Sequence, residues 1–265
     1  MTQHTTAIEK LREHYDELAR SGDDRATAKD YNLRDLEVSV ALEYLADGDA
    51  LLDVGCGPGV ALRQYASARQ LRRAAGLDYS HEMVEAASAK ARAAGIDLEL
   101  KQGSALEMPF ESNAFDIVTC HRVLLALLAW EDQQKAIAEM HRVVRPGGLV
   151  LLFEGTVDGL ERLNFYRRMF HLPEIDEGGR DGYERRLLVE KDLLSFTEPM
   201  FDVVRVQRFG MYYFLTRIVQ PLFVMPDAPR YDHKLNDVAR EVARLIPDFE
   251  HLGQLVGFIL RRKYA

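Results

Sequence analysis

The sequence contains only two cysteines, Cys56 and Cys120, and they lie far apart along the chain. Their number and separation exclude a disulfide framework and the Cys/His spacing of a metal site, so we expect no metal and a reducing, cytoplasmic setting. The sequence has no uninterrupted apolar run of about 18 residues, which argues against a transmembrane helix and stable membrane insertion. Residues 1–22 lack the apolar segment of a signal peptide and are typical of an amphipathic helix.

Positively charged residues are fewer than negatively charged ones. Lysine and arginine total 34 residues against 42 aspartates and glutamates, which gives a formal net charge of −8 at pH 7. Non-specific binding to nucleic acid needs a basic surface that releases counterions from the phosphates, so we expect no nucleic-acid partner. The hydrophobic content of 47% is that of an ordinary globular protein, and we expect a monomer or a homodimer.

Short β-type runs alternate with helical stretches from about residue 50 to residue 153. This alternation predicts an α/β fold, in which a doubly wound parallel sheet has helices on both faces. Strands are expected at residues 50–55, 74–78, 97–103, 115–120, 148–154, 201–209 and 255–263. Helices are expected at residues 6–20, 33–46, 60–70, 80–94, 131–144, 159–171 and 190–197.

Two segments lie outside this alternating core. Residues 1–47 are expected to form a helical N-terminal cap, and the core to span 48–209 and 255–265. The connection over 210–254 is far too long for a hairpin, and such an insertion is usually functional. We interpret it as a lid over the substrate; its apolar start also leaves open a contact with a membrane surface or a lipid-like substrate.

The stretch "LLDVGCGPGVAL" places glycines at 55, 57 and 59, where a strand gives way to a helix. Glycines there let backbone amides approach a ligand closely, with the helix N-terminus directed at it. The spacing departs from the G-x-G-x-x-G pattern of dinucleotide-binding proteins, because the third glycine comes only two positions after the second. Asp53 lies two residues before the first glycine.

This stretch resembles the first motif of the class I S-adenosylmethionine (SAM)-dependent methyltransferases, an acidic residue and an apolar residue followed by G-x-G-x-G. Further family landmarks follow in order, namely "AAGLDYS", "QGSALEMPF", "FDIVTCHRVLLAL" and "EMHRVVRPGGLVLLFE". The resemblance covers about 105 residues and implies a seven-stranded Rossmann-like sheet, with the last strand antiparallel, and SAM as cofactor, converted to S-adenosylhomocysteine (SAH). The cofactor residues that it implies are Asp53, Gly55, Cys56, Gly57, Gly59, Asp78, Tyr79, Met83, Ser104, Ala105, Leu106, Cys120 and His121.

Three of these residues have distinct expected roles. Asp78, at the end of the second strand, would accept hydrogen bonds from the ribose hydroxyls, and could instead cap the next helix. Asp53 would attract the amino group of the cofactor, or only satisfy amides of the turn. Ser104 stands where the family more often has Asp beside the adenine, and its hydroxyl is a weaker acceptor.

The residues at the end of the fourth strand bear on the chemistry. Thr119, Cys120, His121 and Arg122 replace the N-P-P-Y-like tetrad of enzymes that act on exocyclic amines, which disfavours that class. Cys120 lacks the preceding proline of the cytosine C5 enzymes and is better explained as a small buried residue. His121 is the first candidate for a general base and Glu154 the second, although either could have a purely structural role.

The remaining expectation is a methyltransferase that acts on an O, N or C nucleophile of a small molecule, such as a natural-product intermediate or a sugar. Two alternatives stay open, a methyltransferase of a protein or RNA and a SAM-binding partner protein without activity. Aromatic residues of the cap and the lid, with one arginine, are expected to line the substrate pocket or simply to pack. They are Tyr15, Tyr31, Arg122, Tyr212, Tyr213 and Phe214.

Overall fold

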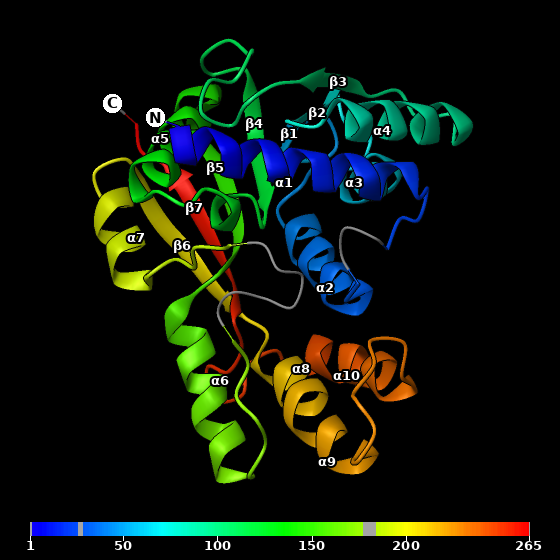
Figure 1. The fold of residues 1–265 in the computed structure, drawn as a ribbon. Helices are drawn as coiled ribbons and strands as arrows, with labels where there is room; N and C mark the ends of the chain where they lie inside the picture. The colour runs from blue at the N-terminus through cyan, green and yellow to red at the C-terminus, as the bar shows by residue number, and fades with distance from the viewer. Residues whose placement is uncertain (1, 26–28, 177–183, 265) are drawn as a thin grey trace.

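The computed structural model describes residues 2–25, 29–176 and 184–264. Seven strands form one sheet in the order β3-β2-β1-β4-β5-β7-β6 (Figure 1). The strands are β1 (Ala50–Val54), β2 (Arg73–Asp78), β3 (Glu99–Gln102), β4 (Phe115–His121), β5 (Val144–Gly155), β6 (Phe201–Arg208) and β7 (Leu255–Arg262). All seven expected strands are present, and the largest difference in bounds is at β5, which begins at Val144.

Strands β1 to β5 pair in parallel, whereas β7 is antiparallel to both of its neighbours, β5 and β6. The predicted fold class, a doubly wound sheet with an antiparallel last strand, is therefore confirmed. Because β6 and β5 both oppose β7, they run in the same direction. The carboxyl ends of β1 to β6 consequently meet at one edge of the sheet, where ligands of such folds bind.

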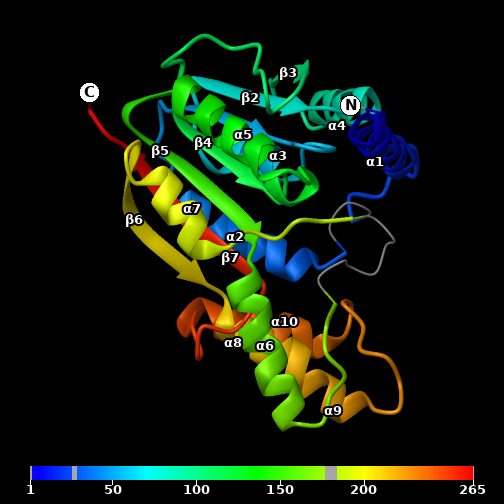
Figure 2. The same cartoon turned by 60° about the vertical axis from the view of Figure 1, so that its left-hand side comes forward.

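Helices lie on both faces of the sheet (Figure 2). Those before β6 are α1 (Thr2–Arg20), α2 (Tyr31–Leu42), α3 (Val60–Ala68), α4 (His81–Ala93), the 3₁₀ turn η1 (Leu124–Ala126), α5 (Trp130–Val143), α6 (Val157–Met169) and α7 (Glu190–Thr197). Between β6 and β7 come α8 (Gly210–Phe214), the π-helical turn η2 (Leu215–Val219), α9 (Gln220–Val224) and α10 (Lys234–Leu245). Within the described ranges, no helix combines the length and apolarity needed to cross a bilayer.

Alternate residues of the central strands supply two separate cores. Leu51 packs on one face with α2, α3, α8 and α10, whereas its neighbour Leu52 packs on the other face with α5 and α7. Both leucines are fully buried. This division follows from the period of two along a strand, and it explains why the central strands read as continuous apolar runs.

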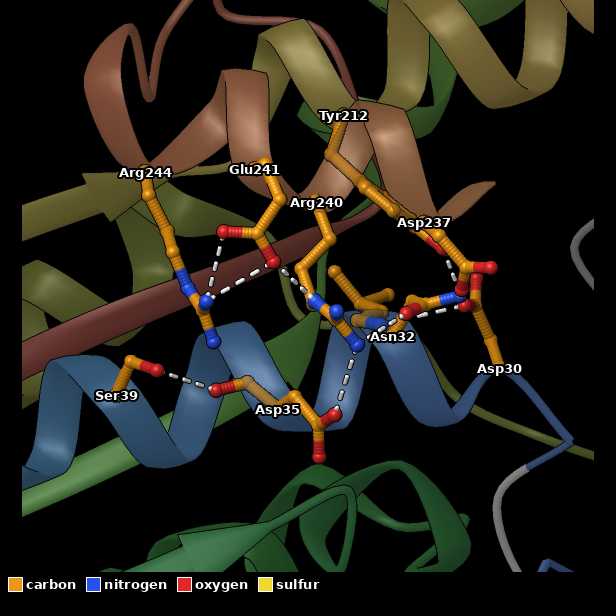
Figure 3. A network of polar contacts seen from close by, with 10 residues as sticks. Asp30, Asn32, Asp35, Ser39, Tyr212, Asp237, Arg240, Glu241 and Arg244 are labelled. Carbon is orange, nitrogen blue, oxygen red and sulfur yellow. Dashed lines mark hydrogen bonds and ion pairs between the residues drawn. The ribbon is translucent and has the colours of Figure 1, made fainter. Parts of the chain in front are cut away.

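Helix α2 joins the N-terminal segment to the insertion after β6. Figure 3 shows Asn32 and Asp35 of α2 facing α10, where Arg240 Nη1 donates to Asn32 Oδ1 at 2.8 Å and lies 3.3 Å from Asp35 Oδ2. Asn32 Nδ2 donates in turn to Asp237 Oδ1 at 3.1 Å. These contacts hold α2 and α10 together near the carboxyl edge of the sheet (Figure 1).

Candidate active site

The glycine turn lies between β1 and α3 at the carboxyl edge of the sheet. Gly55, Gly57 and Gly59 all have positive φ, at 68°, 52° and 72°. The amides of Gly55 and Cys56 donate to the carbonyl of Leu77, at 2.7 and 3.0 Å, which ties the turn to β2. A Cβ atom on Gly55 would lie 2.2 Å from Val123 Cγ2. Glycine is therefore required at position 55 by both conformation and space.

Asp78, the last residue of β2, holds the turn from the other side. Its carboxylate accepts hydrogen bonds from Gly57 N at 2.8 Å and Ser80 N at 2.9 Å. The N-cap of α4 is Ser80, whose hydroxyl accepts from Met83 N, so Asp78 is not the capping residue. Burial raises the pKa of Asp78 to about 6. The carboxylate is thus fixed beside the glycine turn and ionised at neutral pH.

Asp53 is a second buried carboxylate at this edge. It is 2% exposed and accepts a hydrogen bond from Thr119 Oγ1 at 2.8 Å. Burial raises its pKa, although His121 and Thr119 act in the opposite direction. An isolated anion in such a place is costly, and a cationic ligand would offset that cost.

A cavity of about 330 Å³ opens between these groups, which is within the usual size of small-molecule sites. The expected site residues that line it are Tyr15, Asp53, Gly55, Cys56, Gly57, Asp78, Tyr79, Ser104, Ala105, Leu106, His121 and Arg122. The expected residues that are not part of the lining are Gly59, Met83, Cys120, Glu154, Tyr31, Tyr212, Tyr213 and Phe214. Most of the residues from the glycine turn and the ends of β2 and β4 are therefore brought together around one space.

His121 is held at both ring nitrogens. Its Nδ1 lies 2.8 Å from Glu37 Oε2, and its Nε2 lies 2.9 Å from the hydroxyl of Tyr65. The ring also stacks on Phe153, with centroids 4.8 Å apart. An ionised Glu37 can only accept, so Nδ1 carries a proton, and in the neutral ring Nε2 then accepts from the Tyr65 hydroxyl. The lone pair that a general base would use is engaged within the fold.

Glu37 also forms an ion pair with Arg122 through Arg122 Nη1, and it is fully buried. Burial alone would raise the pKa of Glu37, but Arg122 and His121 hold it below its ordinary value. Our sequence reasoning did not identify Glu37 or Tyr65. The available signal was a charge within the apolar stripe of α2, since Glu37 follows Leu33 by four residues and precedes Ala41 by four.

Comparison with known proteins shows similarity to methyltransferases over part of the chain. Residues 52–152 match a family described as a methyltransferase domain. The "Probable methyltransferase ltbC" of Aspergillus luteorubrus is 33% identical over 146 residues, which is 52% of this chain and 50% of that protein. The demethylmenaquinone methyltransferase of Oceanobacillus iheyensis is 34% identical over 133 residues, or 48% and 54%. The chain thus matches about half the length of these relatives. Residues 52–152 therefore carry a methyltransferase domain.

A solved structure supports the fold of this methyltransferase domain. The methyltransferase chain of a complex with the Trm112 methyltransferase activator of Haloferax volcanii superposes with a TM-score of 0.63. The alignment covers 96% of this chain and 98% of that one at 18% identity. An identity this low shows a shared fold and nothing about the ligand.

Glu154 is not part of the cavity lining. Its carboxylate accepts from Val123 N at 2.8 Å, Leu124 N at 2.9 Å and Leu125 N at 3.3 Å. Burial raises its pKa to about 7. Cys120 Sγ lies 3.6 Å from the same carboxylate, and burial raises the pKa of this thiol well above its ordinary value. Glu154 therefore fixes the turn after β4, and that turn supplies Val123 to the cavity wall.

The aromatic residues of the insertion pack away from the cavity of the methyltransferase domain. Tyr212 is fully buried and donates to Asp30 at 2.5 Å, which joins α8 to the start of α2. The Tyr213 hydroxyl accepts from Leu255 N at 3.2 Å, and Phe214 packs on Phe249. These contacts link the insertion to α2 and β7, and α2 contributes Arg34 to the cavity wall.

Proposed function

We propose that this chain is a SAM-dependent methyltransferase that transfers a methyl group to an O, N or C nucleophile of a small molecule. The observation that carries the proposal is Asp78, whose carboxylate is bonded to the glycine turn at the wall of a 330 Å³ cavity. Asp53 lines the same cavity. Two carboxylates beside a turn whose backbone can approach a ligand closely fit a ligand with a ribose diol, an ammonium group and a sulfonium group. None of these three groups needs the backbone amides that bind a phosphate.

The residues that would hold the cofactor follow from this geometry. Asp78 would accept the ribose hydroxyls with the lone pairs left by Gly57 and Ser80. Asp53 would attract the ammonium group, and the segment from Ser104 would lie beside the adenine. Ser104 Oγ accepts from Leu106 N at 3.1 Å, which orients its hydroxyl. When bound, SAM supplies a methyl group made electrophilic by its sulfonium.

The chain's own contribution is orientation and the exclusion of water. An acceptor whose nucleophile carries a proton would have to lose that proton on receiving the methyl group, and the residues around the cavity would hold that nucleophile in place. Holding the nucleophile in line accounts for much of the rate enhancement. Helices α1 and α2 add Arg12, Tyr15 and Arg34 to the cavity wall, and this cover favours a small acceptor over a protein or RNA. The name of the demethylmenaquinone methyltransferase, which refers to a small molecule, agrees with this.

Calorimetry with SAH tests the proposal. We expect binding in the micromolar range and no measurable binding of NAD, because the turn lacks the spacing that holds a pyrophosphate. A screen of small molecules with methyl-labelled SAM would then identify the acceptor and separate an active enzyme from an inactive SAM-binding partner. No heat with SAH, or a preference for NAD, would overturn the proposal.

His121 stays the predicted general base, and its hydrogen bonds define the test. To take a proton at Nε2 the ring must give up the hydrogen bond to Tyr65. His121→Ala is then expected to lower turnover about 100-fold with SAH affinity unchanged, whereas Tyr65→Phe frees Nε2 and keeps turnover. The measurement is the initial rate of labelled methyl transfer to the acceptor found in the screen. Undiminished turnover in His121→Ala would remove the residue from the mechanism.

The partners and the setting are also proposals. The acceptor is the expected partner, and the net charge of −8 argues against nucleic acid. Both cysteines are buried as free thiols, which suits a reducing, cytoplasmic location. We further propose that the segment 1–47 and the insertion 210–254 act together as the cap, with the insertion supporting α2.

A further inference from the structure

Three arginines line the cavity, although the chain as a whole is acidic. Arg12 of α1, Arg34 of α2 and Arg122 after β4 all line the cavity. Two carboxylates would hold the cofactor. Asp53 is the next-to-last residue of β1, and Asp78 is the last residue of β2. Arg122 follows β4, on the other side of β1 in the sheet. The two carboxylates therefore lie along β1 and β2, and Arg122 lies toward β4.

Arg34 is a buried guanidinium that the fold leaves largely unpaired. The residue is only 9% exposed. Its Nη1 donates to the carbonyl of Asp24 at 3.0 Å, while Nε is buried with no hydrogen-bond partner. Within the described ranges no carboxylate forms an ion pair with Arg34, and no bond is made by Nη2. The edge of the guanidinium formed by Nε and Nη2 is the fork that binds an oxyanion through two parallel hydrogen bonds.

Two acidic residues near Arg34, Glu37 and Asp24, form ion pairs with other residues. Glu37 is bonded to Arg122 and His121. Asp24 pairs with Arg63 and Lys90. Burial and the nearby charge of Arg122 lower the pKa of Arg34, and the more weakly acting charges of Asp35, Glu37 and Asp24 do not reverse this direction. A buried guanidinium without an ion pair lowers the stability of the fold unless an anion binds to it. Because Arg34 lines the cavity, a ligand in the cavity can supply that anion.

We propose that Arg34, with Arg122 beside it, binds an oxyanion of the methyl acceptor, a carboxylate or a phosphate. The inference rests on the proposed function and names the acceptor class, an acidic small molecule with an apolar body. The apolar body is suggested by Val123, Ala126 and Leu127, which line the cavity next to Arg122. The carboxylate of the cofactor has the same chemistry as this oxyanion, so the experiment must separate the two sources.

Calorimetry on the SAH-loaded protein provides the test. Benzoate and phenyl phosphate are the anionic probes, and benzamide is the neutral molecule that matches benzoate in shape. We expect at least one anionic probe to bind tenfold or more tightly than benzamide, and Arg34→Gln to abolish that preference while changing SAH affinity less than threefold. Equal binding of all three probes would overturn the proposal. So would a tenfold loss of SAH affinity in Arg34→Gln with the anion preference intact, because Arg34 would then hold the cofactor.

A second readout separates a binding role from a structural one. Because Arg34 lacks a counterion, Arg34→Gln is expected to leave the melting temperature unchanged or to raise it. The matched control is Arg208→Gln, which breaks a two-bond ion pair with Glu190 outside the cavity and is expected to lower the melting temperature without changing the anion preference. A clear drop in melting temperature for Arg34→Gln would contradict the proposal. Absence of SAH binding by the wild type would instead refute the proposed function itself.

Discussion

Replacing Glu37 with alanine is expected to lower the free energy of unfolding by about 3–5 kcal/mol. The change leaves His121, whose side chain is 9% exposed, and Arg122, whose side chain is 28% exposed, without the buried carboxylate that both contact. For a chain of this size the loss corresponds to a fall of roughly 10 °C in melting temperature. Urea denaturation followed by circular dichroism, together with thermal melting, would measure both quantities.

A surface glutamate gives the control for this substitution. Glu241 pairs with Arg240 and Arg244 at the exposed surface of α10 (Figure 3), and Glu241→Ala is expected to leave the free energy of unfolding nearly unchanged. The pKa of Glu37 is held below its ordinary value, so its stabilisation is present above that value and is lost as the pH falls through the lowered pKa. Equal costs for the two substitutions at neutral pH would show that Glu37 does not anchor the network.

Asp78→Ala is expected to weaken SAH binding by about 1000-fold. The change removes two charge-assisted hydrogen bonds to the ribose, together worth about 4 kcal/mol. It also removes the acceptor for Gly57 N and Ser80 N, so the glycine turn loses its attachment to the end of β2. Calorimetry with SAH measures the loss, and circular dichroism shows whether the sheet is retained.

The pH dependence of SAH binding isolates the charge of Asp78. Its pKa of about 6 means that the carboxylate is mostly ionised at pH 7 and mostly protonated at pH 5. Wild-type affinity is therefore expected to fall as the pH drops from 7 to 5, by up to about tenfold per unit. Asp78→Asn keeps the shape without the titration and should give a flat profile. A slope that survives in Asp78→Asn would assign the titration to another group, such as Asp53.

The strands and the glycine turn were predictable because their signals are local. A buried strand needs only a short apolar run, and the turn between β1 and α3 follows from the spacing of three glycines. Asp78 was found in the same way, as an acid at the end of a strand in a family pattern. The antiparallel β7 came from that pattern as well, because periodicity does not give the direction of a strand.

The network around His121 was not predictable, because it depends on packing between distant segments. Glu37 contacts a histidine 84 residues away, and neither residue carries a local signal for the other. The three amides held by Glu154 likewise depend on how the turn after β4 folds back on β5. Tyr212 was expected to line the substrate pocket or to pack, and no periodicity in the sequence indicated that its hydroxyl would reach Asp30.

The contact between α2 and α10 connects the insertion to a residue of the cavity wall. It therefore bears on which acceptor the cavity would bind. Helix α2 carries Arg34 to the cavity wall on one side and is fastened to α10 through Asn32 and Asp35 on the other (Figure 3). A substitution at Arg240 would reposition a residue at the cavity without altering any residue that lines it. On the proposed role of Arg34, substitutions in the insertion would change which acceptor is preferred. The residues of the glycine turn that would hold the cofactor would stay the same.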